Sequence, residues 1–516
     1  MKKLPIGIQT FADIRTDNYC YADKTPLIAQ LIDQGKFYFL SRPRRFGKSL
    51  LIDTISEAFA GKKDLFTGLY LEENWDWNTT YPVIKIDLAQ GIIESRQRLD
   101  QRLLRMFRMQ AQELEVELEC ELPDDCLQEL IVKLNRKYGQ RVVVLVDEYD
   151  KPILDNITNT EKATELRDGL RNIYSVLKAQ GAHLRFVMLT GVSKFSKVSL
   201  FSGLNNLEDI TLDSRFGALC GYTQAELETV FCDYLSGVDL EAVKKWYNGY
   251  NFIGEPVYNP FDILLYLRNY EFKAYWFETG TPSFLINLFK AKKSFIPSFE
   301  TLVIGENLLS SFDVDFIEPQ TLLYQTGYLT IKEKYQRAGQ IRYRLGYPNF
   351  EVKTSLMDSI LNRFAPDLQQ KERTYDEIYR ALQEADLERL HKTLHGFFAS
   401  IPHDWYRKND LAGYEGYYCS VVYCYFAGLG LRVRPEDSTN HGRIDMTVDF
   451  ENRIYIIEFK VNELTEPGRA LEQIKTKKYA EKYQGRDIWL IGVEFSKTER
   501  NISRFEWEKV DGPAIF

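Results

Sequence analysis

The stretch His441-Gly442-Arg443-Ile444-Asp445, followed by Ile457-Glu458-Phe459-Lys460, decides the fold of the C-terminal part of this chain. The two segments have the pattern of β-strands joined by a tight turn at Glu451-Asn452. If the turn is two residues long, residues whose numbers sum to 903 face each other across the hairpin. The sequence therefore predicts that Asp445 lies opposite Glu458.

Asp445, Glu458 and Lys460 are predicted to share one face of this hairpin. Directly opposed carboxylates repel each other and weaken a sheet. A metal ion between them removes the penalty, because hard oxygen ligands suit Mg²⁺ or Mn²⁺. Lys460 lies two residues beyond Glu458, so it projects from the same face. An ammonium beside a metal-bound water can position that water and stabilise charge on a phosphate. The pattern predicts a site that hydrolyses phosphodiesters.

The arrangement resembles the PD-(D/E)XK nuclease superfamily, in the form in which the Asp and the Glu-x-Lys lie on a hairpin. The resemblance implies that Asp445 and Glu458 bind metal and that Lys460 is the lysine of the half-motif. It implies three further site residues. Glu415, on the preceding helix, would be an acid that also binds metal. Gln473 and Tyr479 would be polar site residues later in the chain. The alternative is a solvated hairpin with an incidental Glu and Lys, but the complete order of residues favours the nuclease.

A second motif, near the other end of the chain, has the order of a phosphate-binding loop. An apolar strand at 36–41 leads into Arg42-Pro43-Arg44-Arg45-Phe46-Gly47-Lys48-Ser49, and a helix-like run at 50–55 follows. Lys48 is expected to reach the β- and γ-phosphates of ATP, and the Ser49 hydroxyl to hold Mg²⁺. The helix start supplies N–H groups and the positive end of a dipole.

The beginning of this loop departs from the usual pattern. Arg42 stands where a glycine is usual, and Pro43 removes one backbone donor. A loop whose only glycine is Gly47 cannot rely on backbone N–H groups alone. Arg44 and Arg45 are therefore expected to supply charge and donors to the nucleotide.

A buried-strand pattern at 141–146 ends in two acids, Asp147 and Glu148. By itself it fits a core strand that leads into an acidic loop. With the Gly-Lys-Ser about a hundred residues upstream, it indicates a Walker B motif. Asp147 is then expected to bind Mg²⁺ through water and Glu148 to polarise the attacking water. A third strand pattern ends in Thr190, at the place of a sensor residue, and Ser193 fits that role equally well.

Residues 1 to about 290 resemble the AAA-ATPase-like family that is often fused to this type of nuclease in gut and other anaerobic bacteria. The most specific pieces are Tyr21-Ala22-Asp23-Lys24-Thr25, the loop from Ser41 to Ser49, Val146-Asp147-Glu148-Tyr149-Asp150, Phe201-Ser202-Gly203-Leu204-Asn205-Asn206 and Trp246-Tyr247-Asn248-Gly249-Tyr250. An Arg at position 42 is usual for that family. The resemblance implies that Asp23, Lys24 and Thr25 lie near the nucleotide.

Composition agrees with a protein of several domains. The chain has 516 residues, of which 44% are hydrophobic and 27% charged. No apolar run approaches ~20 residues, and the start lacks the apolar core of a signal peptide, so a cytoplasmic protein without a membrane span is expected. The seven cysteines include no Cys-x-x-Cys and are all expected to be reduced thiols. The five histidines form no zinc pattern.

The net charge of −8 is unusual for a protein that grips nucleic acid over its whole surface. A nuclease needs only a local basic surface. Candidates follow the hairpin, namely Lys475, Lys477, Lys478, Lys482 and Arg486, and a solvated helix face is an equal alternative. The acidic total argues against a non-specific DNA binder that is always active.

The predicted architecture is a multidomain α/β protein with four segments. Residues 1–220 alternate strands and helices as an AAA-like P-loop core, and residues 221–290 form a helical lid that begins with a capping-box Thr223. Residues 291–400 are a helical connector with a hairpin, which resembles a winged helix. Residues 401–516 are the restriction-endonuclease-like α/β domain.

The function that fits best is an ATPase coupled to a Mg²⁺- or Mn²⁺-dependent nuclease, whose substrate is expected to be DNA rather than RNA on family analogy. One alternative is a nucleotide-dependent signalling switch that uses an inactive nuclease fold as a docking module. Another is a structural scaffold. The sequence reveals no convincing arginine finger and leaves the oligomeric state open, a homo-oligomer included.

Overall fold

The computed structural model describes residues 1–194, 204, 206–277, 289, 294–306, 309, 318–364, 367–401, 415–463 and 466–510, except for the side chains of residues 363, 364 and 415. The chain forms two compact units. The first comprises Met1–Trp276 and Val303–Asn349, and the second comprises Phe277–Leu302 and Phe350–Phe516. Among the described residues, no helix is both long and apolar enough to cross a membrane.

The first unit is built on a five-stranded parallel sheet in the order β2-β3-β4-β1-β5. Its strands are β1 (Phe37–Ser41), β2 (Val83–Asp87), β3 (Val142–Asp147), β4 (Leu184–Gly191) and β5 (Glu208–Asp209). β4 lies between β1 and β3, so the phosphate-loop strand and the Walker B strand are not neighbours. All six residues of β3 are buried, as expected for a central strand covered on both faces.

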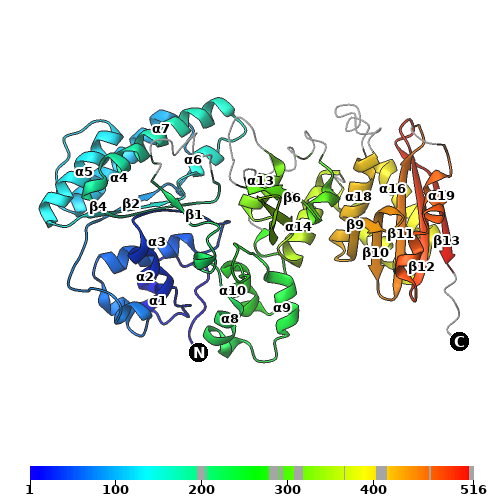
Figure 1. The fold of residues 1–516 in the computed structure, drawn as a ribbon, viewed down its shortest axis with the longest axis horizontal. Coiled ribbons are helices and arrows are strands. Elements are labelled where there is room, and N and C mark those ends of the chain that lie inside the picture. The colour runs from blue at the N-terminus through cyan, green and yellow to red at the C-terminus, as the bar shows by residue number, and fades with distance from the viewer. Residues whose placement is uncertain are drawn as a thin grey trace. The chain divides into compact units, whose positions relative to one another are not determined.

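Helices cover both faces of this sheet (Figure 1). They are α1 (Phe11–Thr16), α2 (Thr25–Gln34), α3 (Lys48–Phe59), α4 (Arg96–Glu113), α5 (Pro123–Tyr138), α6 (Lys151–Leu154) and α7 (Thr160–Ala179). Helices α4, α5 and α7 lie on one side, and α1 to α3 on the other. The pattern at 96–121 predicts one helix, but α4 ends at Glu113. The chain turns at Glu115 with φ of 49°, and Pro123 then starts α5.

The expectation that all seven cysteines are free is wrong for one pair. Cys120 and Cys126 are joined by a disulfide. Cys120 lies in the segment between α4 and α5, and Cys126 lies in the first turn of α5, which brings their Cα atoms to 5.2 Å. The other five cysteines are free.

Three helices follow the core in the range 221–270. They are α8 (Gln224–Val230), α9 (Leu240–Tyr247) and α10 (Pro260–Asn269). The predicted capping box is present, because Thr223 accepts from the Glu226 amide and Glu226 accepts from the Thr223 amide. Buried Leu227, Val243 and Ile263 unite the three helices in one hydrophobic cluster.

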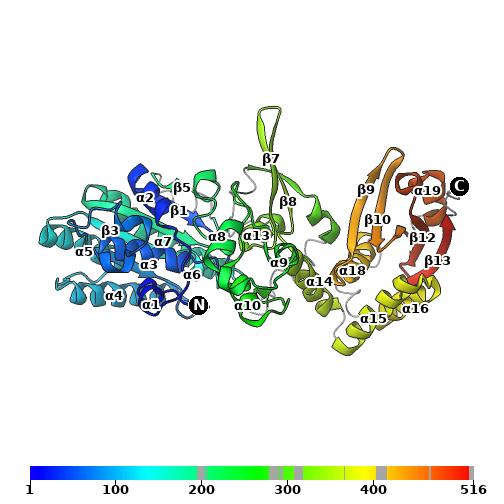
Figure 2. The ribbon, with the colours of Figure 1, turned by 90° about the horizontal axis from the view of Figure 1, so that it is seen from below.

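The remainder of the first unit is a helix beside a small antiparallel sheet. Its elements are β6 (Val303–Gly305), α13 (Pro319–Thr326), β7 (Thr330–Arg337) and β8 (Gln340–Gly346), in the sheet order β6-β8-β7. The sequence pattern predicts a helix at 316–325 and a hairpin at 328–345, and both are present, although residues 316 and 317 lie outside the described residues. Figure 2 shows β7 and β8 as a hairpin extending away from α13.

The second unit contains a five-stranded mixed sheet in the order β13-β12-β11-β10-β9. Its strands are β9 (Arg432–Thr439), β10 (Gly442–Phe450), β11 (Arg453–Val461), β12 (Asp487–Ser496) and β13 (Asn501–Val510). The accompanying helices are α14 (Phe350–Phe364), α15 (Leu368–Glu384), α16 (Leu387–Ser400), α18 (Glu415–Gly428), α19 (Arg469–Thr476) and the 3₁₀ helix η8 (Tyr479–Tyr483). Residues 350–400 thus belong to the compact unit of this sheet.

The sequence pattern at 374–398 predicts one helix, but the structure has two helices there. Ala385 adopts φ of 54° and ends α15, and the Asp386 side chain caps α16 by accepting from the Arg389 amide. An alanine in the left-handed region is unusual, and the Asp cap that follows it supplies the acceptor that a new helix start needs.

The two faces of β11 are buried against different helices. Phe459 faces the α18 side, where Phe495 stacks on Tyr418. Ile454 and Ile456 face the other side and pack in a cluster with Ile474 of α19 and with η8. Glu458 and Lys460 continue this second face. The candidate nuclease residues therefore project toward α19.

Candidate functional site

The hairpin register follows the prediction as far as strand pairing extends. Glu451 and Asn452 form the turn, and the pairs run from Phe450–Arg453 to Met446–Ile457. Asp445 is the next residue of β10. On its other side, β10 pairs with β9 at Ile444 and Met446 but not at Asp445, where the opposing Glu436 has φ of 48°. Asp445 therefore lies at a local irregularity of the sheet.

Asp445, Glu458 and Lys460 form one interacting group. The Phe459 amide donates to Asp445 Oδ2 at 2.8 Å. Lys460 Nζ donates to Glu458 Oε1 at 3.0 Å and lies 3.9 Å from Asp445 Oδ2. A single ammonium thus neutralises part of the charge of two carboxylates.

Burial shapes the protonation of both acids. Glu458 is only 1% exposed, and burial together with the nearby Asp445 charge raises its pKa to about 8, although Lys460 opposes the shift. Burial also raises the pKa of Asp445, against the Lys460 charge. Glu458 Oε2 is buried and has no hydrogen-bond partner. A buried carboxylate oxygen in this condition is costly unless it is protonated or bound to a cation.

Helix α19 and the 3₁₀ helix η8 contribute the remaining polar side chains on this face of the sheet. Gln473 donates to Glu458 Oε1, and Tyr479 donates from its hydroxyl to the Arg443 carbonyl at 2.8 Å. Gly492 pairs with Glu458 in the sheet, and a Cβ there would lie 2.5 Å from the Leu471 amide nitrogen. Only glycine lets α19 approach so closely. A shallow cavity of about 480 Å³, lined by Lys460, Gln473 and the outer side chains of α19, opens beside this group.

Glu415 begins α18, but its side chain lies outside the described residues. Among the residues described, no group of three His, Cys, Asp or Glu side chains lies close enough to hold a metal ion. Asp445 and Glu458 supply only two candidate metal ligands among the described side chains. The third ligand, expected at Glu415, remains a prediction.

Sequence reasoning missed one buried acid beside the site. Glu494 is 1% exposed and is the register partner of Lys460 on β12. Its Oε1 accepts from the Ala470 amide at the start of α19, and its Oε2 has no hydrogen-bond partner. The available signal was a lone acid inside the apolar run Ile488-Trp489-Leu490-Ile491-Gly492-Val493-Glu494-Phe495.

In the first unit, the Gly-Lys-Ser loop meets the Walker B strand. Gly47 has φ of 86° and precedes α3. Lys48 is buried and donates to the Arg42 and Pro43 carbonyls, each at 3.0 Å. Ser49 donates to Asp147 Oδ2 at 2.5 Å, across 98 residues of sequence. The fold thus brings together the two groups expected to hold a nucleotide-bound Mg²⁺.

The structure distinguishes between the two sensor candidates. Thr190 donates to Asp147 Oδ1 at 2.5 Å, and it is fully buried. Ser193 donates instead to the fully buried Asp150, which also accepts from the Ser193 and Val192 amides. Thr190 therefore contacts the predicted Walker B acid directly, whereas Ser193 and Asp150 connect the end of β4 to the segment after β3.

Glu148 lies at the edge of this group in a left-handed conformation, with φ of 51°. Burial raises its pKa, and the charges of Lys48 and Arg44 oppose the rise. A half-buried carboxylate next to a phosphate-loop lysine is suited to orient a water molecule.

The three arginines of the loop have different environments. Arg42 is fully buried: its guanidinium donates to the Ser41, Thr211 and Phe216 carbonyls and lies 3.9 Å from the centre of the Phe252 ring. Arg42, which replaces the usual glycine, thus has a structural role: it holds the loop against the segments around Thr211 and Phe216. Arg44 is exposed, and the Arg45 guanidinium lies 3.8 Å from the centre of the Phe261 ring on α10.

The Asp23-Lys24-Thr25 segment connects neighbouring elements. Asp23 accepts from Thr25 and from the Tyr70 amide. Lys24 donates to Glu226 of α8 at 2.6 Å and to the Ala218 carbonyl at 2.8 Å. Proximity of this segment to the nucleotide remains a prediction.

The basic run after the hairpin is largely neutralised. Three of its cations are paired at hydrogen-bond distance, as Lys475–Glu508, Lys482–Asp437 and Arg486–Asp449. Lys478 Nζ lies 3.9 Å from Glu481 Oε1, beyond that distance. The expectation that this run forms a free basic surface is therefore wrong for three of its five members. Sequence could not reveal this, because Glu508, Asp437 and Asp449 come from other strands.

A parallel-sheet nucleotide-binding core and a hairpin of two acids and a lysine define a P-loop protein with a nuclease-type domain. Residues 5–201 match the model of a family described as predicted AAA-ATPase, and residues 413–505 match the PD-(D/E)XK nuclease superfamily. The chain is 52% identical over 512 residues, 99% of each chain, to the uncharacterized protein in the vnfD 5′ region of Azotobacter chroococcum mcd 1. It belongs to the family in which these two domains are fused.

Proposed function

We propose that this protein binds and hydrolyses ATP and couples nucleotide turnover to a metal-dependent nuclease that cleaves DNA. The observation that carries the nuclease is the group of Asp445, Glu458 and Lys460 on one hairpin face. A purely structural sheet gains nothing from placing the buried Glu458 beside the half-buried Asp445, since the repulsion and desolvation of two carboxylates are unfavourable.

The nuclease residues fit a divalent cation. Glu458 Oε2 is buried without a partner, and Asp445 lies close enough to raise the pKa of Glu458. These carboxylates would hold Mg²⁺ or Mn²⁺, with Glu415 as the proposed third ligand. When bound, the ion would supply positive charge to the scissile phosphate and a more acidic water. Lys460 would orient that water, and Gln473 would hold Glu458 in place.

The ATPase residues divide the work in the first unit. Lys48 would exchange its two loop carbonyls for the β- and γ-phosphates, while Ser49 and Asp147 would hold the Mg²⁺ of the nucleotide. Glu148 would orient the attacking water. Thr190, at the end of β4, would act as the sensor residue through its hydrogen bond to Asp147. Arg44 and Arg45 would supply further positive charge to the phosphates.

The phosphate loop contacts the helices that we propose as a lid, α8 to α10. The Gly221 amide donates to the Phe46 carbonyl at 3.2 Å, and Asn259 donates to the Arg44 carbonyl at 3.4 Å. Arg45 lies against Phe261, the second residue of α10. A nucleotide that rearranges this loop would therefore move the helices, and the lid and connector would expose or assemble the nuclease site.

The test is cleavage of plasmid, single-stranded DNA and RNA with Mg²⁺ or Mn²⁺, with and without ATP. Wild type is compared with Lys460→Ala, and Lys475→Ala on the outer side of α19 is the control. Metal-dependent cutting that only Lys460→Ala abolishes would support the nuclease, and an ATP effect would support coupling. Absence of cutting, together with measurable ATP binding, would refute the nuclease in favour of a nucleotide switch with an inactive docking domain.

A further inference from the structure

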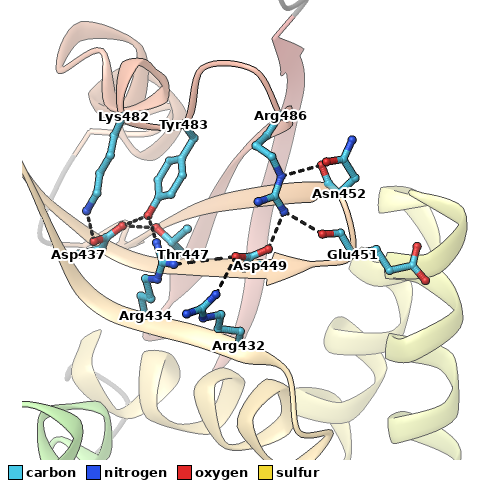
Figure 3. A network of polar contacts seen from close by, with 10 residues as sticks. All are labelled: Arg432, Arg434, Asp437, Thr447, Asp449, Glu451, Asn452, Lys482, Tyr483 and Arg486. Atoms are coloured by element: carbon cyan, nitrogen blue, oxygen red, sulfur yellow. Dashed lines mark hydrogen bonds and ion pairs between the residues drawn. The ribbon is translucent and has the colours of Figure 1, made fainter.

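Four basic side chains and two acids form a connected network over β9 and β10 (Figure 3). Lys482 comes from η8 and Arg486 from the loop before β12. Asp437 accepts from Lys482 and from the Tyr483 hydroxyl, which makes a balanced pair. We call the remaining members, Arg432, Arg434, Asp449 and Arg486, the Asp449 cluster. It has three cations and one carboxylate, so it keeps a surplus of two positive charges.

The carboxylate of the Asp449 cluster is already engaged. Arg486 donates to Asp449 Oδ1 at 2.7 Å and to the Glu451 carbonyl at 2.8 Å. Arg432 and Arg434 each lie 3.9 Å from Asp449 Oδ2, beyond hydrogen-bond distance. The Arg432 side chain is 74% exposed and that of Arg434 is 38% exposed. Figure 3 shows the Glu451 carboxylate turned away from the cluster, so it does not offset the surplus.

The cluster lies on the same sheet face as the candidate nuclease residues. Asp449 and Thr447 pair with Ile454 and Ile456 of β11, whose side chains share the face of Glu458. On β9, Arg432 and Arg434 are the register partners of Asp449 and Thr447. Arg434 is thus displaced by two residues, roughly 7 Å, along the strands from Asp445, and Arg432 by roughly 13 Å.

Resting on the proposed nuclease function, we infer that Arg432 and Arg434 form a binding surface for the phosphate backbone of the nucleic-acid substrate. Two arginines on one strand face, roughly 7 Å apart, can contact different phosphates of one strand. Exposed guanidiniums bind phosphate oxygens through paired donors. The surface leads along β9 and β10 toward Asp445. In a chain with net charge −8, it supplies the local positive surface that the paired lysines after the hairpin do not.

The test measures binding of the full chain, in the non-cutting Lys460→Ala background, to labelled duplex DNA, single-stranded DNA and single-stranded RNA over a range of salt. Arg432→Gln with Arg434→Gln should weaken binding and reduce the slope of log K against log salt by roughly 0.7–0.9 for each phosphate that is no longer neutralised. Arg432→Lys with Arg434→Lys keeps the charge and should restore most of the slope. Thermal unfolding verifies that every variant is folded.

Two further variants make the result specific. Arg373→Gln with Arg380→Gln removes two exposed arginines from α15, which packs on the opposite sheet face through the Tyr455–Leu382 hydrogen bond, and it should leave the slope unchanged. Asp449→Asn raises the surplus charge and should tighten binding. An unchanged slope in the folded double Gln variant would overturn the inference and leave edge protection of β9 as the role of the arginines. An equal loss in the α15 control would overturn it as well.

The same set separates this inference from the nuclease proposal. Metal-dependent cutting by wild type, with binding unaffected by Arg432→Gln and Arg434→Gln, would refute the surface and keep the nuclease. Binding that depends on the two arginines without cutting by wild type would keep the surface and refute the nuclease. The probe with the strongest arginine-dependent binding identifies the substrate as duplex DNA, single-stranded DNA or RNA.

Discussion

The Asp445 carboxylate accepts a 2.8 Å hydrogen bond from the backbone amide of Phe459, the residue between Glu458 and Lys460. The bond fixes Asp445 against the neighbouring strand at a point where the regular ladder has ended. One acid is therefore positioned by backbone and the other, Glu458, by Gln473 and Lys460. The two acids are thus held by different hydrogen bonds, while the Lys460 ammonium lies near both.

Replacing Asp445 should separate charge from structure. Asp445→Asn retains an acceptor for the Phe459 amide but loses the charge, so we expect metal-dependent cutting to fall by at least about 10²-fold with little change in thermal stability. Asp445→Ala also leaves that amide without its partner and should cost a further ~1–3 kcal/mol of unfolding free energy. Rate assays and denaturant unfolding measure the two effects, and equal stability losses in both variants would contradict this account.

The raised pKa of Glu458 predicts a pH-dependent stability in the metal-free protein. Its pKa rises from an ordinary 4.5 to about 8 in the fold. Between these values the folded chain holds a proton that the unfolded chain has released, so stability is greatest below the lower value and declines as pH rises toward about 8. The slope is at most about 1.4 kcal/mol per pH unit.

Thermal unfolding in a chelator, from about pH 5 to 9, measures this decline. Glu458→Gln cannot ionise and should flatten it. A wild-type curve with the same shape as that of Glu458→Gln would show that Glu458 is already ionised at neutral pH.

The close approach of α19 to β12 can be disrupted at one position. A Cβ at Gly492 would lie 2.5 Å from the Leu471 amide nitrogen and 2.9 Å from Leu471 Cβ. Gly492→Ala should therefore displace α19 with Gln473, cost ~1–3 kcal/mol and reduce cutting by about 10²-fold, while ATP binding by the first unit stays unchanged. Gly396→Ala, on α16 in open space, is the control and should be neutral or slightly stabilising. Full activity of Gly492→Ala would contradict the proposed role of α19.

Lys48 should be indispensable for nucleotide binding. Lys48→Ala removes the ammonium and also leaves the Arg42 and Pro43 carbonyls without their donor. We expect calorimetry to show at least about 10²-fold weaker ATP binding and loss of any ATP effect on cutting. Lys62→Ala, at an exposed position beyond α3, is the control for charge. Wild-type affinity in a folded Lys48→Ala protein would remove the phosphate-loop assignment.

Thr190 and Ser193 can be distinguished by their effects on hydrolysis. Thr190→Val keeps the side-chain shape and loses the hydrogen bond to Asp147, so ATP hydrolysis should fall about tenfold with binding retained. Ser193→Ala loses its bond to Asp150 and should act mainly on stability. The reverse pattern, with hydrolysis sensitive only at Ser193, would assign the sensor role to Ser193.

Local pattern alone determined most elements that carry the candidate chemistry. The two-residue turn at Glu451-Asn452 predicted the hairpin register, because side chains alternate between the two faces of a strand. The capping box at Thr223 and the hairpin at residues 328–345 were also predictable, since both depend on neighbours in the sequence. Helix ends were predicted less well. The break at Ala385, for example, is not marked by a glycine or proline in the sequence.

Only the tertiary structure decided which charges meet. The family-typical Arg42 is buried against carbonyls contributed by Thr211 and Phe216, far along the chain. After the hairpin, Lys475, Lys482 and Arg486 are neutralised by carboxylates from β13, β9 and β10, whereas Arg432 and Arg434 retain a surplus of positive charge. The pairing of Cys120 with Cys126 likewise depends on where α5 begins. The periodicity of the sequence indicates which face of an element is buried. The electrostatic effect of a charged side chain depends instead on the partners that folding brings within a few ångströms.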